Sequence, residues 1–231
     1  MTYIQTKSLR NPPSEELQSG DHMTREEFHR IYEKMPEDFK AELVGGVVFV
    51  SPPLRVGHSD HHVPLVTIFF AYEGNTPGVQ SGDNAAVLLS KKSEVQPDVL
   101  MRIRPEFGGR SKTSQEDYFE GPPELIAEIA HSTQSIDLHA KRQDYARHGV
   151  LEYLVLSVKE RQLKWFDLQA NKELTADADG VCRVRTFPGL WINVEGLLRR
   201  DYHQLMATLK LGLETPEHAA FVRQLEAKRG K

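Results

Sequence analysis

The segment from Pro122 to Val150 constrains the fold of this 231-residue chain more than any other. Its first part, Leu125–Ala130, is short and almost wholly apolar, which predicts a buried strand. Small polar residues at 132–135 then offer side chains that cap the start of a helix. The helix is predicted from about Ile136 to His148, with Gly149 as its C-terminal residue. The segment therefore predicts a buried strand joined closely to a helix.

Charged side chains in and near this segment mark a candidate site. Glu128 lies inside the apolar strand, where a charge is costly unless it is paired or binds a metal. A second acid, Asp98, lies in an upstream apolar strand predicted from Glu94 to Ile103. On the helix, three residues recur every four positions and share one face: Asp137, Lys141 and Tyr145. Two acids on neighbouring strands, with a lysine on the next helix, can hold a divalent metal and a water.

Such an arrangement suits phosphodiester hydrolysis, but it has a plainer interpretation as well. Magnesium prefers oxygen ligands and activates water, and Asp98 and Glu128 offer carboxylate oxygens. The ammonium of Lys141 would lower the pKa of the attacking water and stabilise charge on the phosphate. Glu42, in a hairpin predicted about Gly45-Gly46, would complete the metal site or polarise the water. Alternatively, Asp98 caps a turn, and Glu128 forms a buried ion pair with Lys141 without any catalysis.

The other parts of the chain alternate between helices and strands. Residues 1–22 are polar and lack periodicity, which predicts a flexible arm. The segment Thr24–Glu27 matches a capping box and opens a helix. Strand Glu152–Leu156 is followed by antiparallel hairpins that complete a mixed sheet. Two helices are predicted at the end of the chain, Tyr202–Leu213 and Pro216–Lys228.

Two further segments carry histidines or basic residues. A helix is predicted from His58 to Tyr72, with Pro64 in its first turn. Three histidines lie near its start: His58, His61 and His62. Their spacing partly matches metal-ligand spacing, but no cysteine or further ligand cluster supports zinc. A solvated or hydrogen-bonded helix start is therefore the better interpretation. The polar loop from Pro105 to Gly121, with basic residues in and just before it, either contacts a phosphate backbone, covers the site or is a solvated surface loop.

Composition narrows the class of protein. The formal net charge is −4, which does not favour nonspecific binding to nucleic acid, although a local basic face would still permit it. The single cysteine, Cys182, cannot form an internal disulfide and is interpreted as a small buried apolar residue, so we expect a reducing cytoplasm. We expect no membrane association, because no apolar run reaches spanning length and the N-terminus lacks a signal-peptide hydrophobic region.

Several short motifs occur in order around these residues. The central motifs are Gln96-Pro97-Asp98, Pro123–Ala130, Asp137–Lys141, Tyr145, Gly149-Val150 and Glu152-Tyr153. The flanking motifs are Ala41–Gly46, Ser51-Pro52, His58 and Phe187–Trp191. Together they cover roughly residues 24–200, and their order and spacing resemble the Uma-two family, a group of bacterial proteins of unassigned function placed among the PD-(D/E)xK, restriction-endonuclease-like nucleases.

The resemblance implies an α/β fold with a restriction-endonuclease-like core, in which a central mixed β-sheet is flanked by helices and followed by C-terminal helices. It implies a domain over residues 23–200, between an arm at 1–22 and a helical extension at 201–231. It also implies Mg²⁺ or Mn²⁺ held by Asp98 and Glu128, with Glu42 as an auxiliary acid and metal ligand. The lysine expected two residues after the acid is replaced by Ala130, so Lys141 would have to serve instead.

These expectations lead to a metal-dependent endonuclease that hydrolyses DNA phosphodiester bonds, with Glu42, Asp98, Glu128 and Lys141 as its catalytic residues. A homodimer is expected because cutting both strands needs two sites and because the C-terminal helices carry an apolar stripe: Leu205, Leu209, Leu213, Phe221 and Leu225. Two alternatives stay open. One is a noncatalytic nucleic-acid-binding or regulatory module that keeps the fold, and the other is a hydrolase of a smaller phosphate ester.

Overall fold

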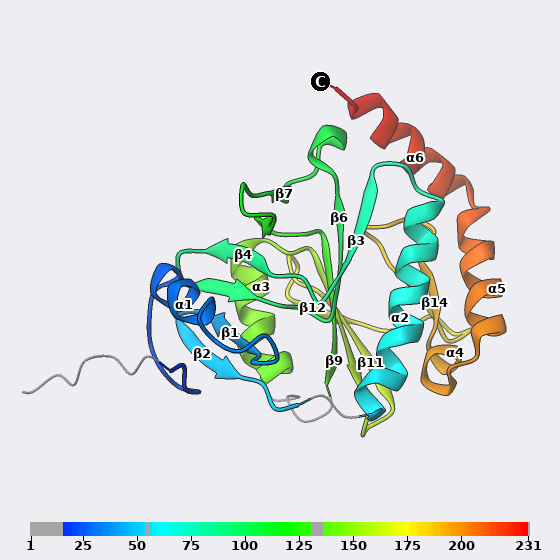
Figure 1. Ribbon diagram of the computed structural model, residues 1–231. Helices are drawn as coiled ribbons and strands as arrows, with labels where there is room; N and C mark the ends of the chain where they lie inside the picture. Colours follow the sequence, from blue (N-terminus) through cyan, green and yellow to red (C-terminus); the bar gives the residue numbers. More distant parts are fainter. Residues whose placement is uncertain (1–15, 54–55, 131–135, 231) are drawn as a thin grey trace, which may run out of the picture.

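The computed structural model describes residues 16–53, 56–130 and 136–230. The helices are α1 Arg25–Tyr32, α2 Val56–Gly74, η1 Pro105–Phe107, η2 Ile136–Lys141, α3 Arg142–His148, α4 Val194–Arg199, α5 Tyr202–Leu213 and α6 Pro216–Lys228. The strands are β1 Ala41–Val44, β2 Val47–Val50, β3 Val79–Asp83, β4 Val87–Ser90, β5 Ser93–Val95, β6 Val99–Ile103, β7 Lys112–Thr113, β8 Phe119–Glu120, β9 Leu125–Ala130, β10 Glu152–Ser157, β11 Gln162–Asp167, β12 Lys172–Leu174, β13 Val181–Arg183 and β14 Trp191–Asn193. The predicted mixed α/β fold is confirmed (Figure 1).

The described strands form two six-stranded mixed sheets and one small hairpin. The first sheet has the order β2-β1-β5-β4-β8-β7, and the second has the order β12-β11-β10-β9-β6-β3. The prediction of one strand over Glu94–Ile103 is wrong, because β5 and β6 belong to different sheets. Pro97 lies at the break, where it has no N–H to donate to a strand partner. The chain therefore crosses between the sheets at Pro97-Asp98.

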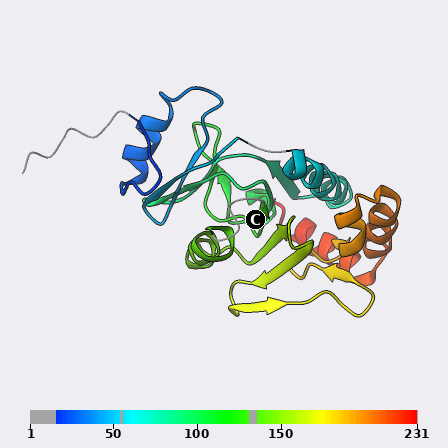
Figure 2. The ribbon, with the colours of Figure 1, turned by 90° about the horizontal axis from the view of Figure 1, so that it is seen from below.

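Helices cover both faces of the second sheet, with α2 on one side and α3 on the other (Figures 1 and 2). Alternate residues of a strand point to opposite faces. In β9, Ala127 packs in the apolar cluster that includes α2, whereas Ile126 and Ala130 pack in the cluster that includes Tyr145 of α3. Glu128 has the same parity as Ile126 and Ala130. Its side chain is therefore directed towards α3.

The first sheet begins with the hairpin predicted about Gly45-Gly46. Both glycines have positive φ, 60° and 88°, as a two-residue hairpin turn requires. The first part of the expected N-terminal arm, residues 1–15, lies outside the described residues. The end of that arm is not loose, because Leu17 is buried and the backbone of Gly20 and Asp21 is hydrogen-bonded to Val48 of β2. This part of the chain is folded against the sheet.

Two helical predictions need correction. Helix α2 spans Val56–Gly74, so Pro64 lies inside it rather than in its first turn. The C-terminal apolar stripe is not free for a partner, because its main residues are buried in the apolar cluster of the same chain: Leu205, Leu209 and Leu225. The argument that this stripe supports a homodimer is therefore lost. Within the described segments, no helix combines the length and hydrophobicity that crossing a membrane demands.

A buried hydrogen bond attaches α6 to the end of α2 and gives a first prediction. His218 Nδ1 donates to the Leu213 carbonyl at 2.9 Å, so His218 Nε2 accepts from Thr76 Oγ1 at 3.0 Å. Thr76→Val would leave that buried acceptor without a donor, and we expect the free energy of unfolding to fall by about 1–3 kcal/mol in urea titrations. Thr67→Val, at a half-buried hydroxyl on α2, is the control and should change it by less than about 0.5 kcal/mol. Equal effects would show that the Thr76 contact does not contribute.

Candidate active site

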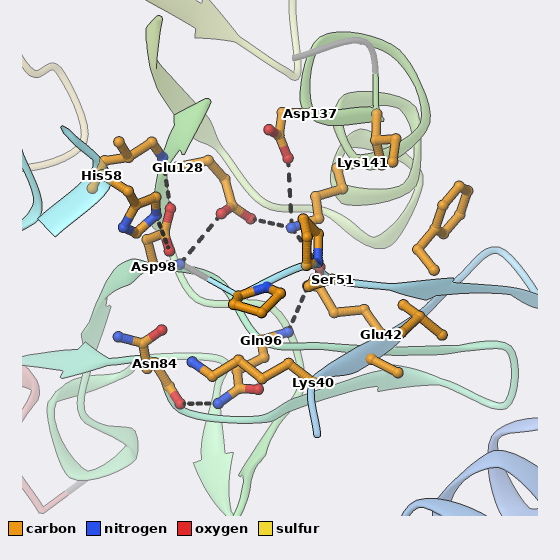
Figure 3. Close-up of a pocket in the computed structure, with 17 residues that line it drawn as sticks. Lys40, Glu42, Ser51, His58, Asn84, Gln96, Asp98, Glu128, Asp137 and Lys141 are labelled. Carbon is orange, nitrogen blue, oxygen red and sulfur yellow. Dashed lines mark hydrogen bonds and ion pairs between the residues drawn. The ribbon is translucent and has the colours of Figure 1, made fainter. Parts of the chain in front are cut away.

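Lys141 lies at the centre of a cluster of buried acids (Figure 3). Its Nζ is 2.6 Å from Glu42 Oε2, 3.0 Å from Glu128 Oε1 and 3.6 Å from Asp137 Oδ1. The lysine side chain is only 7% exposed. Tyr145 OH donates a further hydrogen bond to Glu128 Oε1 at 2.8 Å. The predicted shared face of Asp137, Lys141 and Tyr145 is thus confirmed, and it is directed at Glu128.

The local helix geometry at Lys141 differs from the prediction. The helix predicted from Ile136 to His148 is present, but its first part, η2, is a π-helix that continues as α3. It ends as expected at Gly149, which has a φ of 92°. Short π-helical stretches are rare and occur often at functional sites. The predicted capping residues at 132–135 lie outside the described residues.

Asp98 is held at the crossing between the two sheets, next to Glu128. Its Oδ1 is 3.0 Å from His58 Nε2, and its Oδ2 accepts from the Ile129 N–H at 2.7 Å. The Asp98 N–H in turn lies 3.3 Å from Glu128 Oε2. His62 Nε2 lies 3.0 Å from the Asp98 carbonyl oxygen. The two acids predicted on neighbouring strands therefore do lie side by side.

Glu42 reaches the same place from β1. In addition to its ion pair with Lys141, its Oε1 accepts from the Gln96 N–H at 2.8 Å. Residue 96 belongs to the crossing segment, which has left the ladder of the first sheet and so leaves its N–H available. All four predicted site residues line one pocket, whose wall also includes Lys40, Ser51, His58, Asn84, Gln96, Ile129 and Asp137.

Burial and neighbouring charges both shift the pKa values of Glu128 and Lys141, but burial dominates for Glu128 and the neighbouring charges dominate for Lys141. Burial raises the pKa of Glu128 well above its ordinary value, and the nearby acids add to the shift while Lys141 opposes it. Burial by itself would lower the pKa of Lys141, but the charges of Glu128, Glu42 and Asp137 outweigh it and raise this pKa well above 10.5. Lys141 is therefore an ammonium at neutral pH.

Asp98 behaves differently from Glu128. Burial acts to raise its pKa, but the hydrogen bond and charge of His58, with help from the Ile129 N–H and Lys141, outweigh burial and lower it. Asp98 is therefore a carboxylate at neutral pH. Two carboxyl groups whose pKa values are displaced in opposite directions, side by side in one pocket, are typical of functional sites.

The four acidic and basic residues predicted for the site line this pocket, and so does His58, which was not predicted as part of the site. The histidines were interpreted as a solvated or hydrogen-bonded helix start, and for His58 and His62 the second option is confirmed. One signal in the sequence was available. His58, Leu65 and Tyr72 are spaced by seven along α2 and are all buried, so His58 lies on the apolar face of the helix. A polar residue on such a face needs a buried partner.

The basic residues at the loop between β6 and β9 are engaged within the chain. Arg102 is 5% exposed, donates to Gln80 Oε1, and lies over the Phe119 ring at 4.5 Å from its centroid. Lys112 is 3.3 Å from Glu120. Arg102 is therefore not available to contact a phosphate backbone. Its hydrogen bond with Gln80 instead attaches the start of this region to β3.

The donor set fits a magnesium-type ion but not zinc. Among residues 16–53, 56–130 and 136–230, no group of three or more His, Cys, Asp or Glu side chains is placed to hold a metal. A closed zinc site needs four protein ligands, whereas Mg²⁺ is often held by one or two carboxylates, with water and phosphate oxygens completing its shell. Asp98 and Glu128 are such a pair. Glu42 is occupied by Lys141 and Gln96, and its role as a third ligand stays a prediction.

Comparisons with known proteins concern the family and the fold of the chain. The fold matches the crystal structure titled "putative nuclease belonging to DUF820" from Anabaena variabilis ATCC 29413, with a TM-score of 0.57 and 14% sequence identity, over 74% of this chain and 96% of that one. At this identity the match establishes the fold alone. A search of curated proteins found no match. The family model described as "Putative restriction endonuclease" matches residues 25–195, and the chain therefore belongs to the Uma-two (Uma2) family.

Proposed function

We propose that this protein is a metal-dependent nuclease that hydrolyses phosphodiester bonds in DNA, of the PD-(D/E)xK type. The observation that carries the proposal is the meeting of Asp98, Glu128 and a buried ammonium, Lys141, in one pocket. The family description and the fold shared with a protein titled a nuclease support the same class of reaction. The catalytic residues proposed are Glu42, Asp98, Glu128 and Lys141.

Each residue has a role that follows from its contacts. Asp98 and Glu128 would hold Mg²⁺ or Mn²⁺, which supplies a polarised phosphate and a more acidic water when bound. The Lys141 ammonium, oriented by Glu42 and Asp137, would stabilise the negative charge that develops on the phosphate. In this hydrolysis a P–O bond forms to the water oxygen, the bond to the leaving oxygen breaks, and the proton of the water ends on the leaving group.

Ala130 stands where the wider superfamily has its lysine, and we propose that Lys141 replaces that lysine. Lys141 comes from the helix after the strand, yet its Nζ lies 3.0 Å from the acid of the motif, Glu128. A lysine from a helix can reach the same point in space as one from the strand. Lys141 is the last residue of the π-helical turn η2.

One observation favours an alternative function without catalysis. Each carboxylate oxygen of Glu42, Asp98 and Glu128 already has a hydrogen-bonding partner within 3.3 Å, so the hydrogen bonds of these acids are satisfied without a metal. That pattern would suit a noncatalytic nucleic-acid-binding or regulatory module in which the ion pair stabilises the fold. A hydrolase of a smaller phosphate ester is the other alternative, and substrate assays separate all three.

The test is cleavage of supercoiled plasmid by the purified full chain with Mg²⁺ or Mn²⁺, with chelator as the control, beside hydrolysis of mononucleotides. We expect metal-dependent nicking that chelator abolishes. Manganese affinity is measured in parallel without DNA. If only mononucleotides were hydrolysed, the protein would be a hydrolase of a smaller phosphate ester and not a DNA nuclease. If a folded protein neither cleaved DNA nor bound manganese, the noncatalytic module would be the remaining alternative.

A further inference from the structure

The hairpin of β1 and β2 presents its two faces to different parts of the molecule. Alternate side chains of a strand point to opposite faces. On one face, Ala41 and Leu43 pack in the apolar cluster that also contains residues of α1. On the other face, Glu42 and its cross-strand partner Phe49 line the pocket of the candidate active site. The hairpin therefore forms one wall of this pocket.

The same wall continues by one residue pair beyond the ends of the two strands. Lys40 precedes β1 and Ser51 follows β2, and the Ser51 N–H donates to the Lys40 carbonyl oxygen at 2.8 Å. This hydrogen bond extends the register in which Ala41 lies opposite Val50. Lys40 has the same parity as Glu42, and both Lys40 and Ser51 line the pocket (Figure 3). Side chains opposite each other on one face of a hairpin lie close enough to act together.

Lys40 differs from Lys141, the other lysine that lines the pocket, in having no partner. Lys141 lies within 3.6 Å of three acids, and His58 lies 3.0 Å from Asp98. Within the described part of the chain, neither the Lys40 ammonium nor the Ser51 hydroxyl forms a hydrogen bond or an ion pair. Both side chains are partly exposed, so a ligand that enters the pocket can reach them. An ammonium and a hydroxyl are therefore available as donors.

We infer that Lys40 and Ser51 bind a second phosphate group of the nucleic acid, next to the phosphate that is cleaved. The inference rests on the proposed function, which places the cleaved phosphate at Asp98, Glu128 and Lys141. Four acidic side chains line the pocket, so a phosphodiester strand needs cations beside its phosphate groups to offset the repulsion. Lys141 is already neutralised by these acids, whereas Lys40 forms no ion pair with any of them and is free to pair with a phosphate.

A second phosphate subsite selects the class of substrate. A polynucleotide carries a phosphate on each side of the bond that is cleaved, and one of these groups would occupy the subsite. A nucleoside monophosphate has a single phosphate and would leave the subsite empty. Phosphate contacts position a nucleic acid but carry no direct information on its sequence. The subsite therefore favours a polynucleotide of any sequence over a small phosphate ester.

The subsite predicts how DNA affinity depends on salt. For duplex DNA, the logarithm of the binding constant falls with the logarithm of salt concentration by about 0.9 for each phosphate contact. Lys40→Met should reduce this slope by about 1 and weaken binding at least about 5-fold, equally for duplexes of unrelated sequence. Lys40→Arg keeps the charge and should keep the slope. Ser51→Ala should weaken binding about 3-fold without changing the slope, because a hydroxyl carries no charge.

The test is the affinity of the full chain for a short fluorescent DNA duplex, measured by anisotropy in Ca²⁺ at several salt concentrations. Ca²⁺ takes oxygen ligands, and electrophoresis shows that the DNA is intact. The matched control is Lys34→Met, at an exposed lysine that follows α1 and lies outside the pocket. It should keep the natural affinity and slope. The Tm of each variant should equal that of the natural chain, and Lys40→Gln replaces Lys40→Met if that variant is less stable.

The outcomes separate this subsite from the proposed catalysis. A slope that Lys40→Met leaves unchanged, or that Lys34→Met lowers equally, would overturn the subsite even if the natural chain cleaves DNA. A natural chain that binds DNA through Lys40 but does not cleave it would retain the subsite and remove the catalysis. A natural chain that does not bind the duplex would overturn both.

Discussion

Lys141→Met is expected to lower the free energy of unfolding by about 3–5 kcal/mol at neutral pH. Methionine keeps most of the length and apolar volume of the lysine stem but removes its charge. Glu42, Glu128 and Asp137 would then share a buried site without the ammonium that now lies 2.6–3.6 Å from each of them. Urea unfolding curves of the variant and the natural chain measure the difference.

The loss of unfolding free energy in Lys141→Met should depend on pH. The folded-state pKa of Lys141 is raised above its ordinary value, so its stabilising contribution is fully present below about pH 10 and is lost only as the pH rises through the folded-state pKa. Burial already raises the pKa of Glu128 and Lys141 opposes this shift, so in the variant the Glu128 carboxyl takes up a proton more readily as the pH falls. The difference between the two proteins should therefore be larger at about pH 8 than at about pH 5.

The control for this experiment is Lys210→Met. Lys210 of α5 is 76% exposed and lies 3.8 Å from Glu214, the residue after this helix, so the two form an ion pair in water. Its replacement should change the free energy of unfolding by less than about 0.5 kcal/mol. If Lys141→Met were equally mild, the buried acids would have to be neutralised by protons in the natural chain, and the assignment of Lys141 as their cation would be wrong.

Asp98→Asn is expected to lower the rate of metal-dependent plasmid nicking by at least about 1,000-fold. Asparagine preserves the size of the side chain but removes the negative charge, and one of its terminal atoms becomes a donor that faces either His58 or the Ile129 N–H. The manganese affinity of the free protein should fall at the same time, which separates loss of metal from loss of fold. Cleavage is followed by conversion of supercoiled to nicked plasmid, and affinity by calorimetry.

The matched control for Asp98 is Asp83→Asn. Asp83 also pairs with a histidine of α2, His62, at 2.9 Å, but its side chain is 55% exposed and does not line the pocket. Cleavage by this variant should stay within about twofold of the natural rate. An Asp98→Asn protein that binds manganese and cuts as well as the Asp83→Asn protein would remove Asp98 from the proposed metal site.

Local elements were predictable because their signals lie within a few residues of one another. The capping box at Thr24, the turn at Gly45-Gly46 and the helix end at Gly149 all occur as expected. The strand β9 was equally clear from its apolar run. The single strand predicted over Glu94–Ile103 failed because apolar composition does not reveal where a chain changes sheets, and Pro97 gave the only local indication.

The sequence by itself determined which residues could carry chemistry, since a Glu inside the strand β9 and a lysine on the next helix are costly to bury without a purpose or a partner. Only the tertiary structure decided that Glu42, Asp98 and Lys141 lie close to Glu128 and that His58 is within hydrogen-bond distance of Asp98. It also decided that the apolar stripe of the C-terminal helices is buried within the chain. The physical reason is that periodicity sets the face on which a side chain lies, whereas the order of strands and the packing of helices set what that face meets.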